Sequence, residues 1–244
     1  MWFSVVLRMG QILFTERMAT DSGKTELDYA ISLKMVLELR EIKVSEITGA
    51  IIGSVVPPVT SLMREAIRKV TGQEALVVNV DMNIGLEVLM DNPSSVGTDL
   101  IVGAVAGINR YPVPLILIDM GTATTICVVN ENKQYIGGMI LPGIGVSMNS
   151  LTSRTAQLPR ISLDPPKRLI GKNTVECMQS GALYGNASCI DGMVDRIEEE
   201  LGQKATVVAT GGLARKIIPL CRHQIELDDE LLLRGLWIIY KKNK

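Results

Sequence analysis

Histidine, cysteine and aromatic residues are scarce in this chain of 244 residues, and their scarcity limits the chemistry that it can perform. The one histidine, His223, stands near the C-terminus, and its Arg-His-Gln context favours a surface or loop residue over a catalyst. The four cysteines are widely and irregularly spaced, so no zinc site or CxxC redox motif can be drawn from them. We therefore expect reduced thiols, and any acid–base chemistry to use carboxylates.

An excess of charge and a long apolar run are also missing. Charged residues make up 21% of the chain and the formal net charge is −1, so the broad basic field of a nucleic-acid-binding protein is not there. The longest apolar stretches, residues 50–59 and 231–240, are interrupted by prolines or by Arg234 and fall short of the roughly 18 residues of a membrane span. The first residues do not resemble a secretory signal. We expect a cytoplasmic protein whose partners include neither nucleic acid nor a membrane.

What the chain does contain is a short apolar run that ends in a carboxylate, a glycine and three threonines, at residues 115–125. Such a run is typical of a strand that is buried on both faces. At its exit Asp119 can hold a cation, and Gly121 lets the backbone approach an oxyanion closely. Hydroxyl groups that can donate to phosphate oxygens follow at Thr122, Thr124 and Thr125. The string predicts a phosphate site, with an ordinary β-turn as the alternative, since turns also prefer Asp and Gly.

A second candidate nucleotide contact is the string Thr210-Gly211-Gly212, which follows another short apolar run. Its two glycines would expose backbone amides at the N-terminus of a helix starting near Leu213. An ordinary loop is the equally open alternative, because Gly-Gly after a strand is common.

Strand and helix periodicities alternate along the chain, which predicts an α/β protein of two compact halves. The expected strands are a hairpin within residues 4–17 that turns at 8–10, and runs at 47–56, 75–80, 113–118, 124–130, 134–140 and 207–209. The expected helices are at 27–40, 57–70, 174–187, 190–201 and 229–241.

Two glycines lie four residues apart, at Gly181 and Gly185, within the helix expected at 174–187. Glycine in a helix interior costs about 1 kcal/mol relative to alanine. We therefore expect a reason in packing, such as the close approach of another helix, or in ligand binding.

Six motifs occur in the order seen in one enzyme family. They are Asp91-Asn92-Pro93, Val96-Gly97-Thr98-Asp99, residues 119–125, Gly137-Gly138 through Pro142-Gly143, Gly171-Lys172-Asn173-Thr174, and residues 209–214. With these motifs in this order, the chain resembles the type III pantothenate kinases from Ser4 onward. The resemblance implies two actin-like (ribonuclease H-like) α/β domains with mixed sheets, at residues 1–112 and 113–244, the first of them N-terminally truncated.

The family transfers the γ-phosphate of ATP to the primary hydroxyl of pantothenate, which gives 4'-phosphopantothenate in the first step of coenzyme A biosynthesis. By resemblance, Asp99 accepts the proton of that hydroxyl, and Asp119 holds a monovalent cation, K+ or NH4+, beside ATP and Mg2+ or another divalent ion. The substrate side would comprise Met90, Gly97, Thr98, Leu100 and Thr174, and the ATP side Gly121, Thr122, Gly211 and Gly212. The family also implies a homodimer. A helix N-cap is the alternative role of Asp99, because an apolar run follows it.

Three features depart from the family pattern. A strand and an Asp-x-Gly-Asn-Thr phosphate loop normally precede the hairpin, and because their loss would leave costly unpaired strand edges, we expect the stated start to lie about ten residues inside the full protein. Leu100 replaces an arginine and offers no donors to substrate or phosphate. Met90 replaces a tyrosine. These departures support an alternative function, a catalytically impaired paralogue that binds nucleotide or another ligand and acts by association or regulation. An actin-fold kinase acting on a different small hydroxyl compound is a third possibility.

Overall fold

The structure is a computed structural model that describes residues 2–8, 11–18, 20–21 and 23–244. Its contacts divide the chain into two compact units, each with strands and helices. The first comprises Met1–Gly85, Asn92–Ala106 and Leu232–Lys244, and the second Leu86–Asp91 and Gly107–Leu231. The domain boundary expected after residue 112 stays a prediction.

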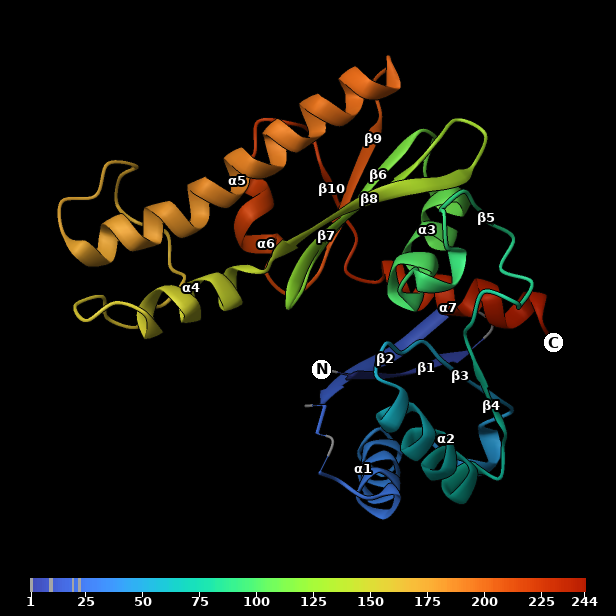
Figure 1. Ribbon diagram of the computed structural model, residues 1–244. Coiled ribbons are helices and arrows are strands. Elements are labelled where there is room, and N and C mark those ends of the chain that lie inside the picture. Colours follow the sequence, from blue (N-terminus) through green and yellow to red (C-terminus); the bar gives the residue numbers. More distant parts are fainter. Residues whose placement is uncertain (1, 9–10, 19, 22) are drawn as a thin grey trace. The chain divides into compact units, whose positions relative to one another are not determined.

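The first unit contains two small sheets (Figure 1). Strands β1 (Trp2–Arg8) and β2 (Gln11–Met18) pair antiparallel, and β3 (Ala50–Ile52) and β4 (Ala75–Val77) pair parallel. The helices are α1 (Glu26–Leu39), α2 (Pro57–Thr71), most of α3 (Thr98–Arg110) and all but the first residue of α7 (Leu231–Lys242), with 3-10 turns at Val44–Glu46 and Pro93–Ser95. The predicted hairpin is confirmed, although its turn at Met9 and Gly10 lies outside the described residues.

Local sequence explains where the helices of this unit begin and end. Thr25 and Asp28 form a capping box at the start of α1, in which each side chain accepts the other's backbone N–H. Pro57 opens α2, and Gly72 closes it in the left-handed conformation, at φ 69°.

Two strands of this unit are shorter than the sequence predicts. The runs at 47–56 and 75–80 contribute only three residues each to their parallel ladder. A 3-10 turn ends at Glu46, and α2 starts at Pro57, so only a short piece of the first run lies beside β4. Apolar character indicated neither the burial of the first run nor the length of the ladder. In the run at 47–56 no residue is fully buried and Val55 is exposed, whereas Ala75 and Val78 of the second run are buried.

The second unit is built on a mixed six-stranded sheet of order β10-β9-β6-β7-β8-β5. Its strands are β5 (Glu87–Val88), β6 (Leu115–Met120), β7 (Ala123–Val129), β8 (Gln134–Pro142), β9 (Thr206–Thr210) and β10 (Glu226–Leu227). Strands β6, β7 and β8 form an antiparallel meander, and β9 is parallel to β6. The helices are α4 (Ile144–Ser153), α5 (Thr174–Leu201) and α6 (Ala214–Ile217), followed by a 3-10 turn at Ile218–Leu220. The three successive strands predicted here are confirmed.

Both faces of β6 are buried. Ile116, Ile118 and Met120 belong to a core cluster that includes residues of α5 and α6, which lie together beside the sheet (Figure 1). On the opposite face, a Cβ at Gly107 would lie 3.0 Å from the Leu117 side chain, so the end of α3 packs closely there. Asp119 has the parity of Leu117 and therefore points away from α5.

Helix α5 is one element of 28 residues, so the prediction of two separate helices at 174–187 and 190–201 is wrong. Neither Ser188 nor Cys189 breaks a helix, and the first stop signal is Gly202, which closes α5 at φ 68°. A Cβ at Gly181 or Gly185 would meet nothing within 4 Å, so no described helix of this chain approaches either glycine closely. Despite the length of α5, no helix among the described residues is long and apolar enough to cross a membrane.

Candidate active site

Strand β6 ends at a carboxylate that lies between two glycine turns. Asp119 is half-buried and is paired in the sheet with Thr125 of β7 and Thr210 of β9. A Cβ on Gly211 would lie 2.6 Å from Oδ1 of Asp119, and one on Gly121 would lie 3.8 Å from the same oxygen. The structure therefore brings the predicted cation ligand and both predicted phosphate turns together at one end of the sheet.

The turn after β9 requires glycine at its first position. Gly211 has φ 100°, and a Cβ there would lie 2.6 Å from the backbone nitrogen of Met120. The missing side chain leaves a cradle of backbone beside Asp119, suited to an ion or a phosphate oxygen. Gly212 follows directly in this turn. The helix expected from Leu213 is short, since α6 covers only Ala214–Ile217, so its dipole contributes little.

A third segment, at Gly143, is hydrogen-bonded to the turn after β6. The Gly143 N–H donates to the Thr122 carbonyl oxygen at 3.1 Å. A Cβ on Gly143 would overlap that oxygen and lie 2.5 Å from the Gly121 carbonyl oxygen. Gly143 is the N-cap of α4, a helix that the sequence analysis did not predict, although the Pro142-Gly143 motif marks its position.

The three threonine hydroxyls expected to meet phosphate lie in different surroundings. Thr122 is exposed and Thr125 is half-buried, whereas Thr124 is only 5% exposed. Within the described part of the chain, Oγ1 of Thr124 has no hydrogen-bond partner. Leaving a buried hydroxyl unpaired costs about 1–3 kcal/mol, so this side chain calls for an explanation in binding.

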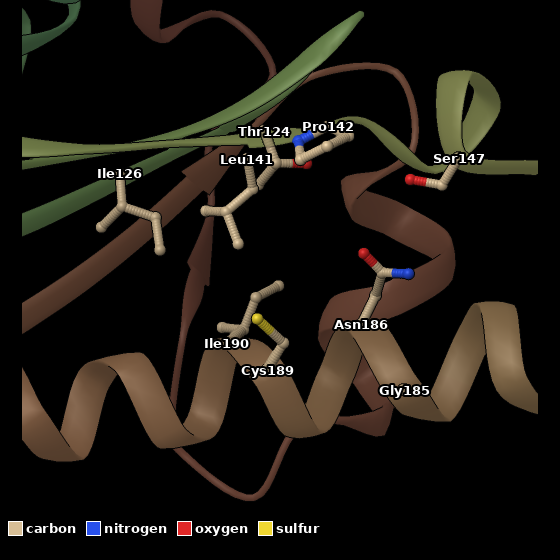
Figure 2. A pocket seen from close by; sticks show the side chains of 9 residues that line it. All are labelled: Thr124, Ile126, Leu141, Pro142, Ser147, Gly185, Asn186, Cys189 and Ile190. Carbon is tan, nitrogen blue, oxygen red and sulfur yellow. The ribbon is translucent and has the colours of Figure 1, made fainter. Parts of the chain in front are cut away.

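Thr124 lines a cavity of about 260 Å³ between the sheet and α5 (Figure 2). Figure 2 shows its hydroxyl, the hydroxyl of Ser147 and the amide oxygen of Asn186 directed toward the same space. The Asn186 amide nitrogen is already used, because it donates to the Ala182 carbonyl at 2.7 Å. The remaining lining residues are Ile126, Leu141, Pro142, Gly185, Cys189 and Ile190. No charged side chain lines this cavity among the described residues, so it suits a neutral group with hydroxyl or amide functions.

Sequence reasoning missed Ser147 and Asn186, because they come from two helices and from no shared motif. Gly185 was the one available signal. It lines the cavity, and the space over it is open, so the ligand explanation remains for Gly185, whereas Gly181 does not line the cavity.

Four predicted site residues lie together in the first unit, at the start of α3. The Ile101 N–H donates to the Gly97 carbonyl at 3.2 Å, so Gly97 holds the N-cap position. Asp99 therefore lies within the first turn, and its N-cap role is wrong. The hydroxyl of Thr98 donates to the Ser54 carbonyl at 2.9 Å, which ties the turn to the segment after β3.

Asp99 itself is exposed, so its carboxylate is accessible to a ligand. Its Oδ1 accepts the Leu100 N–H at 2.9 Å. A Cβ on Gly97 would lie 2.5 Å from that oxygen, so the glycine leaves room for the carboxylate. Leu100, next in the chain, is half-buried.

The other two substrate-side candidates belong to the second unit. Met90 is half-buried, and its sulfur would lie 3.9 Å from a Cβ on Gly137, which adopts φ 140° in β8. Thr174 is exposed at the first position of α5. The preceding Asn173 caps the helix by accepting the Glu176 N–H at 2.9 Å.

Comparison with known proteins decides the family. Residues 4–196 match the sequence pattern of the type III pantothenate kinases. A type III pantothenate kinase of Bacillus cytotoxicus is 43% identical over 238 residues, which are 98% of this chain and 91% of that protein. The chain belongs to the type III pantothenate kinase family. The resemblance drawn from the six sequence motifs is thereby confirmed.

A solved structure supports the fold of this type III pantothenate kinase family member. The activator of the 2-hydroxyisocaproyl-CoA dehydratase from Clostridium difficile, with bound ADPNP, superimposes with a TM-score of 0.53 at 14% identity. The match covers 98% of this chain and 89% of that one. With its mixed α/β sheets, the chain has the actin-like ATPase fold that the motifs implied.

Proposed function

We propose that this chain transfers the γ-phosphate of ATP to the primary hydroxyl of pantothenate, giving 4'-phosphopantothenate and ADP, the first step of coenzyme A biosynthesis. Membership of the type III pantothenate kinase family carries this proposal. In the transfer, the hydroxyl oxygen forms a bond to the γ-phosphorus, the bond from that phosphorus to the β-phosphate oxygen breaks, and the hydroxyl proton leaves to a base.

Asp119 and the two glycine turns form the phosphate end of the ATP site. The donor set fits a cation, because a half-buried carboxylate faces the cradle left by Gly211. Asp119 would hold the monovalent ion, K+ or NH4+, and ATP would arrive with Mg2+ or another divalent ion. Bound cations there neutralise charge on the phosphates. The backbone of Gly121, Gly211 and Gly212, together with the Thr122 hydroxyl, would orient the phosphate oxygens.

The cavity beside this site takes the nucleoside half of ATP. The phosphate turn is adjacent to it in the chain, because Pro142 lines the cavity and the next residue, Gly143, donates a hydrogen bond to the Thr122 carbonyl. Its neutral lining matches ribose hydroxyls and an uncharged base. The unpaired hydroxyl of Thr124 would gain its partner from the ligand.

Asp99 is the base in this proposal. A carboxylate suffices because the proton leaves late in a loose transition state. Gly97, Thr98 and Thr174 would contact pantothenate, as would the positions of Leu100 and Met90, where this chain lacks an arginine and a tyrosine. Because both replacements fall on the substrate side, we expect them to weaken pantothenate recognition more than the chemistry at the ATP phosphates. For the same reason, a catalytically impaired paralogue is the second candidate function. We also propose a cytoplasmic homodimer, in keeping with the family.

The direct test measures phosphopantothenate formed from ATP and pantothenate in potassium buffer, with sodium buffer as the comparison. We expect turnover that potassium raises and that Asp99→Asn lowers by about 10² or more. Asp81→Asn, which removes an exposed carboxylate of the same unit, is the matched control and should leave turnover unchanged. A folded protein that binds ADPNP but forms no product would identify the impaired paralogue.

A further inference from the structure

A histidine and two carboxylates converge on the second half of α5, away from the residues of the candidate active site. Nε2 of His223 lies 2.8 Å from Oδ1 of Asp195. Glu198, three residues further along α5, is the third member, and one ligand atom from each residue lies within 4.8 Å of the other two. Because residues three apart share a helix face, both carboxylates point to the side on which the histidine stands.

The histidine is held over α5 by backbone hydrogen bonds that do not use its ring. Oδ1 of Asp191 accepts the His223 N–H at 3.1 Å. The two oxygens of the same carboxylate accept the Arg222 N–H at 3.0 and 2.9 Å. Asp191 therefore fixes the segment after the 3-10 turn to α5, one helical turn before Asp195, and the imidazole is positioned in advance.

A hollow of about 500 Å³ opens beside this cluster and gives access to it. It is lined by Ser188, Asp191, Gly192, Asp195, Arg222 and His223. The side chain of Asp195 is 59% exposed and that of His223 is 22% exposed, whereas that of Glu198 is 8% exposed. Asp195 and His223 therefore face the hollow, whereas Glu198 is the buried member of the cluster.

We propose that Asp195, Glu198 and His223 form a site for a divalent transition-metal ion of the zinc class. One imidazole nitrogen and two carboxylate oxygens are a ligand set that zinc accepts, with bonds of about 2.0–2.2 Å and hence donors about 3.4 Å apart in a tetrahedron. The observed donor separations, from 2.8 Å to at most 4.8 Å, bracket that value, so small side-chain rotations complete the site. The two carboxylates balance the charge of the dication. A bound ion would tie α5 to the segment that leads into β10.

Lys204 competes with the metal for Glu198. Its Nζ lies 2.6 Å from Oε2 of Glu198, while Oε1 accepts the Ala205 N–H at 3.1 Å. The Lys204 side chain is 82% exposed, so it can swing into water when an ion arrives. Burial raises the pKa of Glu198, but the hydrogen bonds from Lys204 and Ala205 outweigh it and leave the pKa below its usual value.

The test is a titration of the full, reduced chain with Zn2+ against a chromophoric chelator, followed in parallel by NMR of the ring protons of the single histidine. We expect one ion per chain and a shift of those ring signals. Asp195→Asn and His223→Asn should each raise the Kd at least about tenfold. Asp164→Asn, an exposed carboxylate of the same unit, should leave the Kd unchanged, and Lys204→Met should lower it several-fold.

Three results would overturn the proposal. The first is the absence of saturable binding up to about 1 mM Zn2+, which is too weak for a built site. The second is binding that both ligand variants retain, which would assign the ion to the thiols. The third is a Lys204→Met variant that binds no more tightly than the native chain, because Glu198 would then not be a ligand. None of these outcomes depends on kinase activity, so the metal site and the proposed function can fail separately.

Discussion

Gly211 stands so close to Asp119 that a single added carbon would fill the space beside the carboxylate, 2.6 Å from its Oδ1. Asp119 lies in β6 and Gly211 directly follows β9, the parallel neighbour of β6, so the two residues meet where the carboxyl ends of these strands lie side by side. Their proximity makes the cradle at this edge sensitive to the smallest change in side-chain volume.

Gly211→Ala should therefore lower phosphoryl transfer strongly, by about tenfold or more, because an overlap at the ATP phosphates disturbs positioning. The matched control is Gly72→Ala. Gly72 also has a positive φ, 69°, but its Cβ would meet nothing within 4 Å. Gly72→Ala should lose about 1 kcal/mol of stability from the backbone strain, and Gly211→Ala should lose more, because its Cβ also overlaps the backbone of Met120; denaturant unfolding would measure both. Equal activity in the two would show that the space beside Asp119 is not used.

Leu100→Arg should raise kcat/KM for pantothenate several-fold, because the guanidinium adds a fork of donors next to Asp99. Leu100→Met keeps the position apolar and serves as its control. Steady-state kinetics with varied pantothenate would check this. If Leu100→Arg does not raise kcat/KM, the missing arginine donors do not limit the activity of this chain.

Gly181→Ala and Gly185→Ala form a pair that separates helix stability from ligand binding. Both glycines lie in the interior of α5 with open space around them, so each alanine should stabilise the protein by up to about 1 kcal/mol. Only Gly185 lines the cavity, so only Gly185→Ala should raise the KM for ATP. A rise in both, or in neither, would argue against the cavity as the nucleoside site.

ATP should slow the alkylation of Cys189, a half-buried thiol that lines the cavity. Cys177 is exposed and lies outside the cavity lining, so its rate is the internal control. Mass spectrometry of iodoacetamide-treated protein with and without Mg-ATP would measure both rates. Equal protection of the two cysteines would indicate a global effect of ATP and not occupancy of the cavity.

Cys221 should resist alkylation at pH 8 in the folded protein. Burial raises the pKa of its thiol to about 12, with the nearby Asp191 carboxylate as the smaller cause. Its ordinary value is 9.0, so the unfolded chain releases the proton first as the pH rises. The contribution of the neutral thiol to the free energy of unfolding is therefore fully present below pH 9 and is lost as the pH rises toward 12. Denaturant midpoints measured across this pH range would show the loss. Alkylation of Cys221 at the rate of Cys177 would contradict this.

The grouping of Asp119 with the two glycine turns was predictable, because each part lies in a short continuous stretch of sequence. Asp119 with Gly121, and Gly211 with Gly212, each follow an apolar strand, and strand ends meet by the rules of sheet topology. The cavity was not predictable in this way. Thr124, Ser147 and Asn186 come from a strand and two helices, and what joins them is the packing of α5 on the sheet.

The same limit applies to His223. The sequence placed it on the surface, and no spacing rule pairs it with Asp195, which lies 28 positions earlier. The pairing depends on how the segment after the 3-10 turn folds back on α5, a tertiary contact through Asp191. The continuity of α5 is a separate matter, because the sequence has no stop residue between the two predicted helices and the single helix runs on to Gly202.

Helix α5 carries Thr174 at its first turn, Asn186 near its middle and Asp195 beyond it. Each residue of a helix advances the direction of the next by about 100°, so these three positions are set relative to one another by counting residues. Loss or gain of one residue between them would turn one end away from its neighbours while leaving the helix intact. In this element the number of residues, more than the identity of most of them, specifies the directions in which these three candidate side chains point.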